Sequence, residues 1–118
     1  MINVYLKNFV FSGDLQIKQN VKECGVKVEG HSGLGQKGSD IICSAISAMV
    51  QTAIASITLI AEIPQDIIQK KGHLESTIYL SGLNQKKTEA LHIILNTMIV
   101  GLKLIDENYP KTLEIIVE

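Results

Sequence analysis

The segment GHSGLGQKGSDIICSAISAMV (residues 30–50) joins a glycine-rich half to a strongly apolar half. Four glycines fall within nine positions, and this density is entropically unfavourable in a helix or strand, so the first half is predicted to be a loop. These glycines are Gly30, Gly33, Gly35 and Gly38. From residue 41 onward, apolar side chains recur at spacings of three and four. That period predicts a helix over residues 41–60, with Asp40 or Ser39 as its N-cap.

The candidate catalytic residues lie around the junction between the predicted loop and the predicted helix. Cys43 is predicted to lie in the first helical turn, where unpaired N–H groups and the helix dipole favour a thiolate over a thiol. His31 stands at the other end of the loop, which could bring its imidazole to the thiol as a base or acid. Asp40 could orient that imidazole as well as cap the helix. Ser47 follows Cys43 by one turn on the same face, where its hydroxyl could bond the thiolate, a substrate or the helix backbone.

Other interpretations of these residues stay open. A cysteine in a helix is often only a small buried hydrophobe. The glycines also have the G-x-G-x-x-G spacing of dinucleotide-binding loops, but no βαβ unit with an acidic residue in the required place is evident. Cys24, His31, Cys43 and His73 could supply four zinc ligands, yet metal-site spacings such as C-x-x-C are missing from the sequence. We therefore predict no cofactor and no metal, and we expect His73 and His92 to face solvent without a role.

Length and composition describe the expected domain. With 118 residues, the chain is predicted to form one domain over residues 1–118. The hydrophobic fraction is 46% but the aromatic fraction only 4%, which predicts an aliphatic core. The 11 basic and 12 acidic residues give no basic surface for nucleic acid or an anionic membrane, so neither is expected as a ligand.

The N-terminal sequence and the lengths of the apolar runs predict the cellular location of the protein. The N-terminus lacks the pattern of a signal peptide, and polar residues interrupt the longest apolar run, so we expect no membrane-spanning helix. A cytoplasmic location follows as a prediction. In that reducing compartment Cys24 and Cys43 are expected to be thiols rather than a disulfide.

The remaining segments alternate between strand and helix patterns. Apolar alternation predicts a first strand over residues 2–11 that could contain a bulge, and a second over 26–29. Residues 15–23 have no clear period and are compatible with a strand, a short helix or a loop. Residues 66–70 and 74–80 suggest a hairpin, Asn84 caps a second helix to about residue 107, and residues 112–117 form a last strand. The predicted fold is an α+β sandwich in the order β-β-α-β-β-α-β, with two helices packed on a small mixed or antiparallel sheet.

One motif in the chain resembles a known family. The pair GH, the glycine-bearing loop, the string G-x-D-I-[IV]-C-[SA]-A-[IV]-S and a following Q-T resemble the ribosomal-processing cysteine protease family, Prp. The matching positions are Gly30, His31, Gly38, Asp40, Ile41, Cys43, Ala45, Ser47, Gln51 and Thr52. The resemblance implies a small bacterial cytoplasmic endopeptidase, typically a homodimer, that removes a short N-terminal extension from a large-subunit ribosomal protein. It implies His31 and Cys43 as the catalytic pair, with Asp40 and Ser47 in support.

The chain departs from the family pattern before the histidine. Thirty residues precede His31, a longer route than is typical of the family, and SGDLQIKQNVKECG (residues 12–25) is the apparent extra material. Ser32, Leu34 and Gln36 also differ from the alanine, aromatic residue and glutamate often found in the loop. These changes are expected to affect substrate fit rather than the chemistry.

Three functions are compatible with the sequence. The leading hypothesis is a cysteine endopeptidase whose loop over residues 32–39 closes on a bound peptide, with N–H groups at the start of the helix binding the oxyanion. The alternative is a non-catalytic dimeric module that binds a peptide or assists ribosome assembly. A thiol-transfer or redox protein is a third hypothesis.

Overall fold

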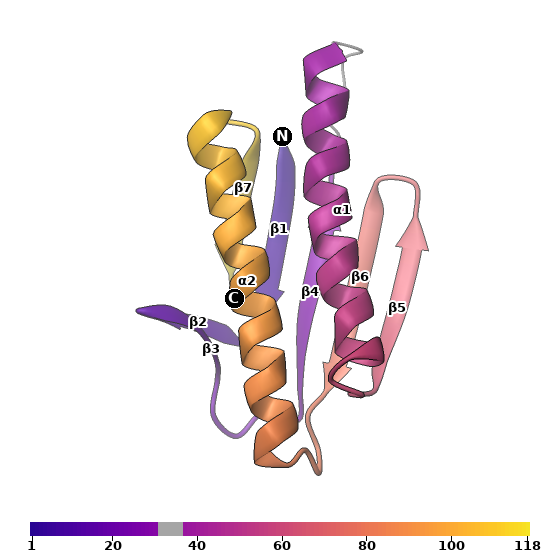
Figure 1. Ribbon diagram of the computed structural model, residues 1–118, viewed down its shortest axis with the longest axis vertical. Helices are drawn as coiled ribbons and strands as arrows, with labels where there is room; N and C mark the ends of the chain where they lie inside the picture. The colour runs from indigo at the N-terminus through magenta and orange to yellow at the C-terminus, as the bar shows by residue number, and fades with distance from the viewer. Residues whose placement is uncertain (31–36) are drawn as a thin grey trace.

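The computed structural model of the protein describes the backbone of residues 1–30 and 37–118 and the side chains of residues 1–30 and 41–118. Its elements follow in the order β1 (Ile2–Lys7), β2 (Phe9–Ser12), β3 (Asp14–Ile17), β4 (Glu23–Glu29), α1 (Lys37–Leu59), β5 (Gln65–Lys70), β6 (His73–Tyr79), α2 (Gln85–Asn108) and β7 (Leu113–Val117). The predicted α+β architecture is confirmed, with two short strands more than expected (Figure 1).

Five strands form one mixed sheet in the order β5-β6-β4-β1-β7. The pairs β5–β6, β6–β4 and β4–β1 are antiparallel, whereas β1 and β7 are parallel. Both helices lie on the same face of this sheet, and no helix among the described residues covers the other face (Figure 1). The molecule is therefore a two-layer sandwich, as the apolar stripe of the second helix predicts.

An aliphatic core fills the space between the layers. Alternate residues of β1 face the helices and are fully buried, namely Ile2, Val4 and Leu6. The helices contribute Ile46, Val50 and Ile57 from α1 and Leu91, Leu95 and Leu102 from α2. Each such side chain contributes about 1.5–3 kcal/mol relative to an exposed one. The prediction of a core built from aliphatic residues is confirmed.

The prediction of one continuous strand over residues 2–11 is wrong. Asn8 adopts a left-handed conformation with φ 67°, which a short polar side chain tolerates better than most residues do. Its side-chain amide donates a hydrogen bond to the carbonyl of Glu23 at 2.8 Å. The chain therefore leaves the main sheet at Asn8, and β2 pairs with β3 in a separate two-stranded sheet.

The segment that the sequence left undecided contributes β3 to this hairpin. Asn96 of α2 accepts a hydrogen bond from the N–H of Leu15 at 2.8 Å and donates one to its carbonyl at 2.9 Å. The side chain of Leu15 is buried in the core. The β2–β3 hairpin is thus attached to α2 and lies apart from α1 (Figure 1), whereas the last three of the extra residues begin β4 of the main sheet.

The two helices are long and apolar. Asn84 caps α2 as predicted, because its side-chain oxygen accepts a hydrogen bond from the N–H of Lys87 at 2.9 Å. By length and composition alone, Ile41–Leu59 (mean hydropathy 1.7) and Gln85–Asn108 (mean hydropathy 1.4) could each cross a membrane. The prediction that polar residues interrupt every apolar run long enough to span a membrane is therefore wrong by length and mean hydropathy. Apolar helices that cover the core of a protein meet the same criterion, so length and hydropathy alone do not indicate a membrane span.

Candidate active site

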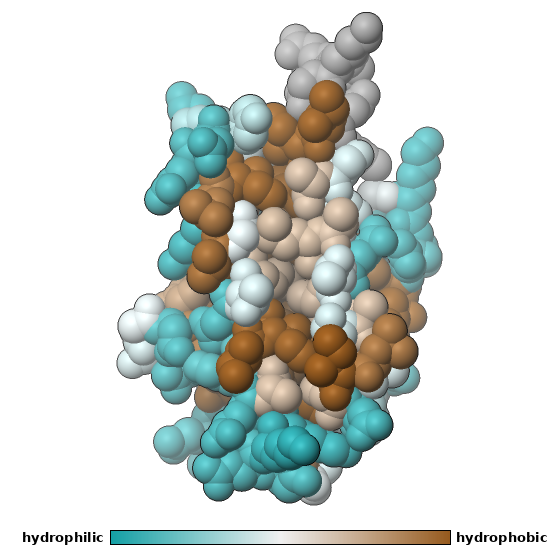
Figure 2. Space-filling view, viewed as in Figure 1, coloured by the Kyte–Doolittle hydropathy of each residue, from teal (hydrophilic) through white to brown (hydrophobic). Residues whose placement is uncertain are grey.

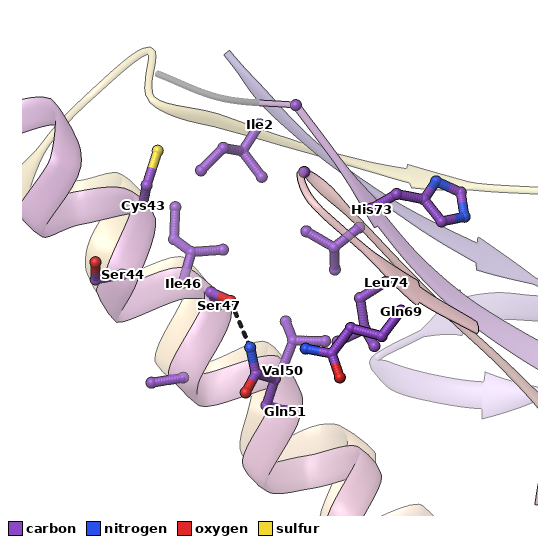
Figure 3. Close-up of a pocket in the computed structure, with 14 residues that line it drawn as sticks. Ile2, Cys43, Ser44, Ile46, Ser47, Val50, Gln51, Gln69, His73 and Leu74 are labelled. Carbon is purple, nitrogen blue, oxygen red and sulfur yellow. Dashed lines mark hydrogen bonds between the residues drawn. The ribbon is translucent and has the colours of Figure 1, made fainter. Parts of the chain in front are cut away.

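A cavity of about 390 Å³ lies between the first half of α1 and the end of the sheet where β4 stops and β5 turns into β6. Its apolar lining comes from Ile2, Val28, Ile46, Val50 and Leu74. Its polar lining comes from Cys43, Ser44, Ser47 and Gln51 on α1 and from Gln69 and His73 on the sheet. Cys43 and Ile2 lie at one end of the cavity, and Gln51 and Gln69 lie at the other (Figure 3).

Cys43 is partly exposed in this cavity, but it is not in the first turn of the helix. The helix α1 begins at Lys37, so Cys43 is its seventh residue and belongs to the second turn. The dipole and the unpaired N–H groups act mainly within the first turn. The helix N-terminus therefore stabilises a thiolate at this position less than predicted. The N–H of Cys43 lies inside the helix and is not available to an oxyanion.

The early start of α1 corrects two further predictions. Asp40 is the fourth residue of the helix by its backbone and is not the N-cap, and Gly38 and Ser39 belong to the helix rather than to the loop. The apolar period located only the part of α1 that packs on the core. A polar first turn gives no such signal, although an acidic residue there is favoured by the dipole.

Gly30 follows the last residue of β4 and lines the cavity. Its φ is +108°, and a Cβ added there would lie 2.6 Å from the carbonyl oxygen of Met1. Its N–H donates to the carbonyl of Gly72 at 3.2 Å, which ties the end of β4 to the turn between β5 and β6. Only glycine fits this position without strain. His31, Gly33 and Gly35 lie outside the described residues.

Ser47 lies in the cavity with Cys43, on the same face of α1. Its hydroxyl oxygen accepts a hydrogen bond from Nε2 of Gln51 at 2.8 Å (Figure 3). Gln51 was predicted only as a matching position of the family motif, with no chemical role. The spacing of four residues from Cys43 to Ser47 and from Ser47 to Gln51 was the signal that could have placed all three on one stripe.

The two histidines of the described region are more buried than predicted, and both have partners. His73 Nδ1 lies 3.0 Å from Glu29 Oε1, and its Nε2 lies 3.3 Å from Glu75 Oε2. His73 touches the cavity, but its ring points away from Cys43 (Figure 3). His92 Nε2 lies 2.8 Å from Asp14 Oδ2, between α2 and the hairpin. Neither ring is directed at the thiol.

Cys24 contrasts with Cys43. It lies on β4 with 1% of its surface exposed, and burial, followed by the nearby charge of Glu23, raises its pKa to about 12. Cys24 and Cys43 are not joined in a disulfide. A search of the described residues finds no group of three or more His, Cys, Asp or Glu side chains that could hold a metal ion.

Solved structures show the same fold. The crystal structure of an essential ribosomal processing protease Prp from Staphylococcus aureus, with a covalently linked product peptide, has a TM-score of 0.71 at 23% identity and covers 100% of both chains. A protein from Streptococcus mutans has a TM-score of 0.66 at 22% identity, covering 99% of this chain and 93% of that one. At these identities the likeness establishes the fold alone.

Sequence comparisons agree with the structural ones. The family model described as Cysteine protease Prp matches residues 14–114. The ribosomal processing cysteine protease Prp of Staphylococcus aureus is 29% identical over 104 residues, which cover 86% of this chain and 93% of that protein.

Proposed function

Because the chain belongs to the Prp family of cysteine proteases, we propose that it is an endopeptidase that removes a short N-terminal extension from a large-subunit ribosomal protein. The observation that carries the proposal is the partly exposed Cys43 in a cavity that is large enough for peptide side chains. The wall opposite ends at Gly30, and the next residue in the sequence is His31. We propose that residues 1–118 act as one such domain in the bacterial cytoplasm.

In the proposed reaction, Cys43 is the nucleophile and His31 the general base and acid. His31 takes the proton of the Cys43 thiol, the thiolate sulfur attacks the scissile carbonyl carbon, and the carbonyl electron pair moves to oxygen. When this intermediate collapses, the C–N bond breaks and the imidazolium of His31 gives its proton to the leaving amine. Water then attacks the thioester carbon while His31 takes one of the water protons. The C–S bond breaks, the carboxylic acid is released, and His31 returns its proton to the sulfur of Cys43.

Ser47 and Asp40 support this pair. Because Ser47 Oγ accepts a hydrogen bond from Gln51, its own proton remains available for the thiolate or for the oxyanion. This hydroxyl supplies part of the oxyanion stabilisation that was predicted to come from N–H groups at the start of the helix. We assign Asp40 to the orientation of His31. His73 is a poor substitute for His31, because its ring contacts Glu29 and Glu75 and points away from the thiol (Figure 3).

We also propose a homodimer that forms through the outer face of the two helices. Large apolar side chains are exposed there, including Ile41 (70% exposed), Ile93 (64%) and Val100 (58%). Hydrophobic residues spread over α1 and α2 on this face (Figure 2). Soluble monomers rarely expose contiguous apolar patches of this kind. The double variant Ile93→Lys, Val100→Lys should have a monomeric mass by light scattering, whereas Ile67→Lys on the edge strand β5 should leave the dimer intact.

The proposed activity is tested on ribosomal proteins. The purified protein is incubated with the large-subunit proteins of its own organism, and new N-termini are identified by mass spectrometry. Removal of a short N-terminal extension from one protein, and its loss in the Cys43→Ala variant, is the expected result. Cleavage that persists in Cys43→Ala would contradict the assignment of the nucleophile, and the absence of any new N-terminus would contradict the substrate.

A further inference from the structure

The cavity beside Cys43 extends well beyond the thiol. Cys43, Ser47 and Gln51 are spaced by four residues and line one face of α1. At about 1.5 Å of rise per residue, Gln51 lies roughly 12 Å along the helix axis from Cys43. Bond cleavage as proposed above uses only the Cys43 end. The far end, at Gln51 and Gln69, supplies no group that touches the reacting atoms in that chemistry (Figure 3).

Two side-chain amides flank this far end from opposite walls. Gln51 comes from α1, and Gln69 comes from β5, where it pairs in register with Leu74 of β6. Leu74 is buried beneath the helices, and directly paired residues share a face of the sheet. Gln69 therefore projects from the edge strand toward α1, over the cavity (Figure 3).

The chemistry of this end suits an uncharged main chain. A glutamine amide has two N–H donors and a carbonyl acceptor, and the bond from Gln51 to Ser47 uses only one donor. Between the two amides the lining is apolar, from Val50 and Leu74. Among the described residues that line the cavity, there is no Asp, Glu, Lys or Arg. A site of this kind binds peptide N–H and C=O groups through amides and accepts an apolar side chain on its floor.

We propose that Gln51 and Gln69 bind the main chain of the substrate three to four residues away from the scissile bond. An extended peptide rises about 3.3 Å per residue, so roughly 12 Å corresponds to that number of residues. The apolar lining between the amides then holds one uncharged side chain of the peptide. This inference rests on the proposed endopeptidase function and adds the reach of the substrate site and its specificity for an uncharged segment.

The test combines glutamine variants with peptides of different length. Peptides that contain the cleavage site are shortened stepwise from each end, and kcat/KM is measured for the wild type, Gln51→Ala and Gln69→Ala. Each variant is expected to lower kcat/KM for long peptides by about 3- to 10-fold, mainly through KM, which corresponds to one lost hydrogen bond. The effect should vanish once one truncation series removes the fourth residue from the scissile bond.

The matched control is Gln85→Ala, because Gln85 bonds Glu89 on the exposed start of α2. It should behave as the wild type with every peptide. An equal loss for long and short peptides in Gln51→Ala would show that Gln51 acts only by positioning Ser47, and would overturn the inference for this residue. Full activity of both variants on the long peptides would overturn it entirely.

A binding measurement separates this inference from the proposed activity. A fluorescent long peptide is titrated into Cys43→Ala, with and without the glutamine substitutions, and anisotropy is recorded. Weaker binding in both glutamine variants supports the inference even if the wild type leaves the peptide uncut, in which case only the proposed activity fails. Unchanged affinity in both variants overturns the inference even if the wild type cuts the peptide.

Discussion

The two cysteines of the chain occupy opposite environments. Cys24 lies near the start of β4, the central strand of the sheet, and is 1% exposed, with its pKa raised to about 12 by burial and then by Glu23. Cys43 is partly exposed on α1 and lines a cavity that also contains Ser47. Since the thiolate is the nucleophile, a buried thiol that holds its proton is inert. Position in the fold, rather than residue type, therefore distinguishes the inert thiol of Cys24 from the proposed nucleophile Cys43.

The largest expected difference between the two sites is in catalysis. Cys43→Ala should lower cleavage of the extended ribosomal peptide by about 10⁴-fold or more, because the covalent pathway is lost. Cys24→Ala should retain activity and lose about 1–2 kcal/mol of stability, because it leaves a small cavity in the core. Steady-state kinetics and urea unfolding of both variants measure these effects. Comparable loss of activity in both variants, with both fully folded, would remove the contrast.

Alkylation provides the second comparison. In the folded protein, iodoacetamide should modify Cys43 about 10³-fold faster than Cys24. Cys24 must wait for an opening of the sheet, and openings of core strands cost several kcal/mol. Peptide mapping after timed quenching gives both rates in one sample. Faster labelling of Cys24 under native conditions would contradict the assignment of Cys43 as the reactive thiol.

Alkaline pH should destabilise the protein through Cys24. Its pKa is raised from the ordinary value of 9.0 to about 12, so the folded state holds this proton more tightly than the unfolded state does. The resulting stability is fully present below pH 9 and is lost as the pH rises through 12, by about 2–4 kcal/mol in total. Urea unfolding between pH 8 and about 11 should therefore show a steeper decline for the wild type than for Cys24→Ala. Parallel curves would show that the Cys24 proton is not coupled to folding.

The smallest expected effect concerns Ser47. Ser47→Ala should lower kcat/KM by about 3- to 10-fold, because it removes one hydroxyl donor beside Cys43. Ser47→Thr keeps the hydroxyl and should recover most of the activity, a rescue that a purely structural serine would not require. The labelling rate of Cys24 should be the same in both variants. Wild-type activity of Ser47→Ala would restrict Ser47 to a structural role.

The sequence predicted those parts of the molecule whose signals are local. Strand alternation located β1 and the second half of β4, the hairpin pattern located β5 and β6, and the short polar side chain at Asn84 correctly marked the start of α2. The break at Asn8 was missed, because the left-handed conformation there is stabilised by a bond to Glu23, fifteen residues away. The start of α1 was missed because its first turn is polar and has no apolar period.

The candidate site shows the same limit. The helical period predicted that Cys43 and Ser47 lie on one face of the helix. The structure confirms this, because both residues line the same cavity. Gln69 could not be found in this way. It reaches the cavity only through the register of β5 against β6, and a shift of one residue would turn it to the other face. The raised pKa of Cys24 likewise depends on burial by side chains that are distant in the sequence.

If Cys43 is the nucleophile, its thiol forms a covalent bond with the peptide during cleavage. The wild-type protein is mixed with the extended ribosomal peptide, quenched in acid within milliseconds to seconds, and analysed by intact-mass spectrometry and peptide mapping. We expect a transient acyl adduct that retains the part of the peptide on the N-terminal side of the scissile bond, mapped to Cys43 and missing from Cys43→Ala. An adduct on Cys24, or single-turnover cleavage whose rate is unchanged in Cys43→Ala, would contradict it.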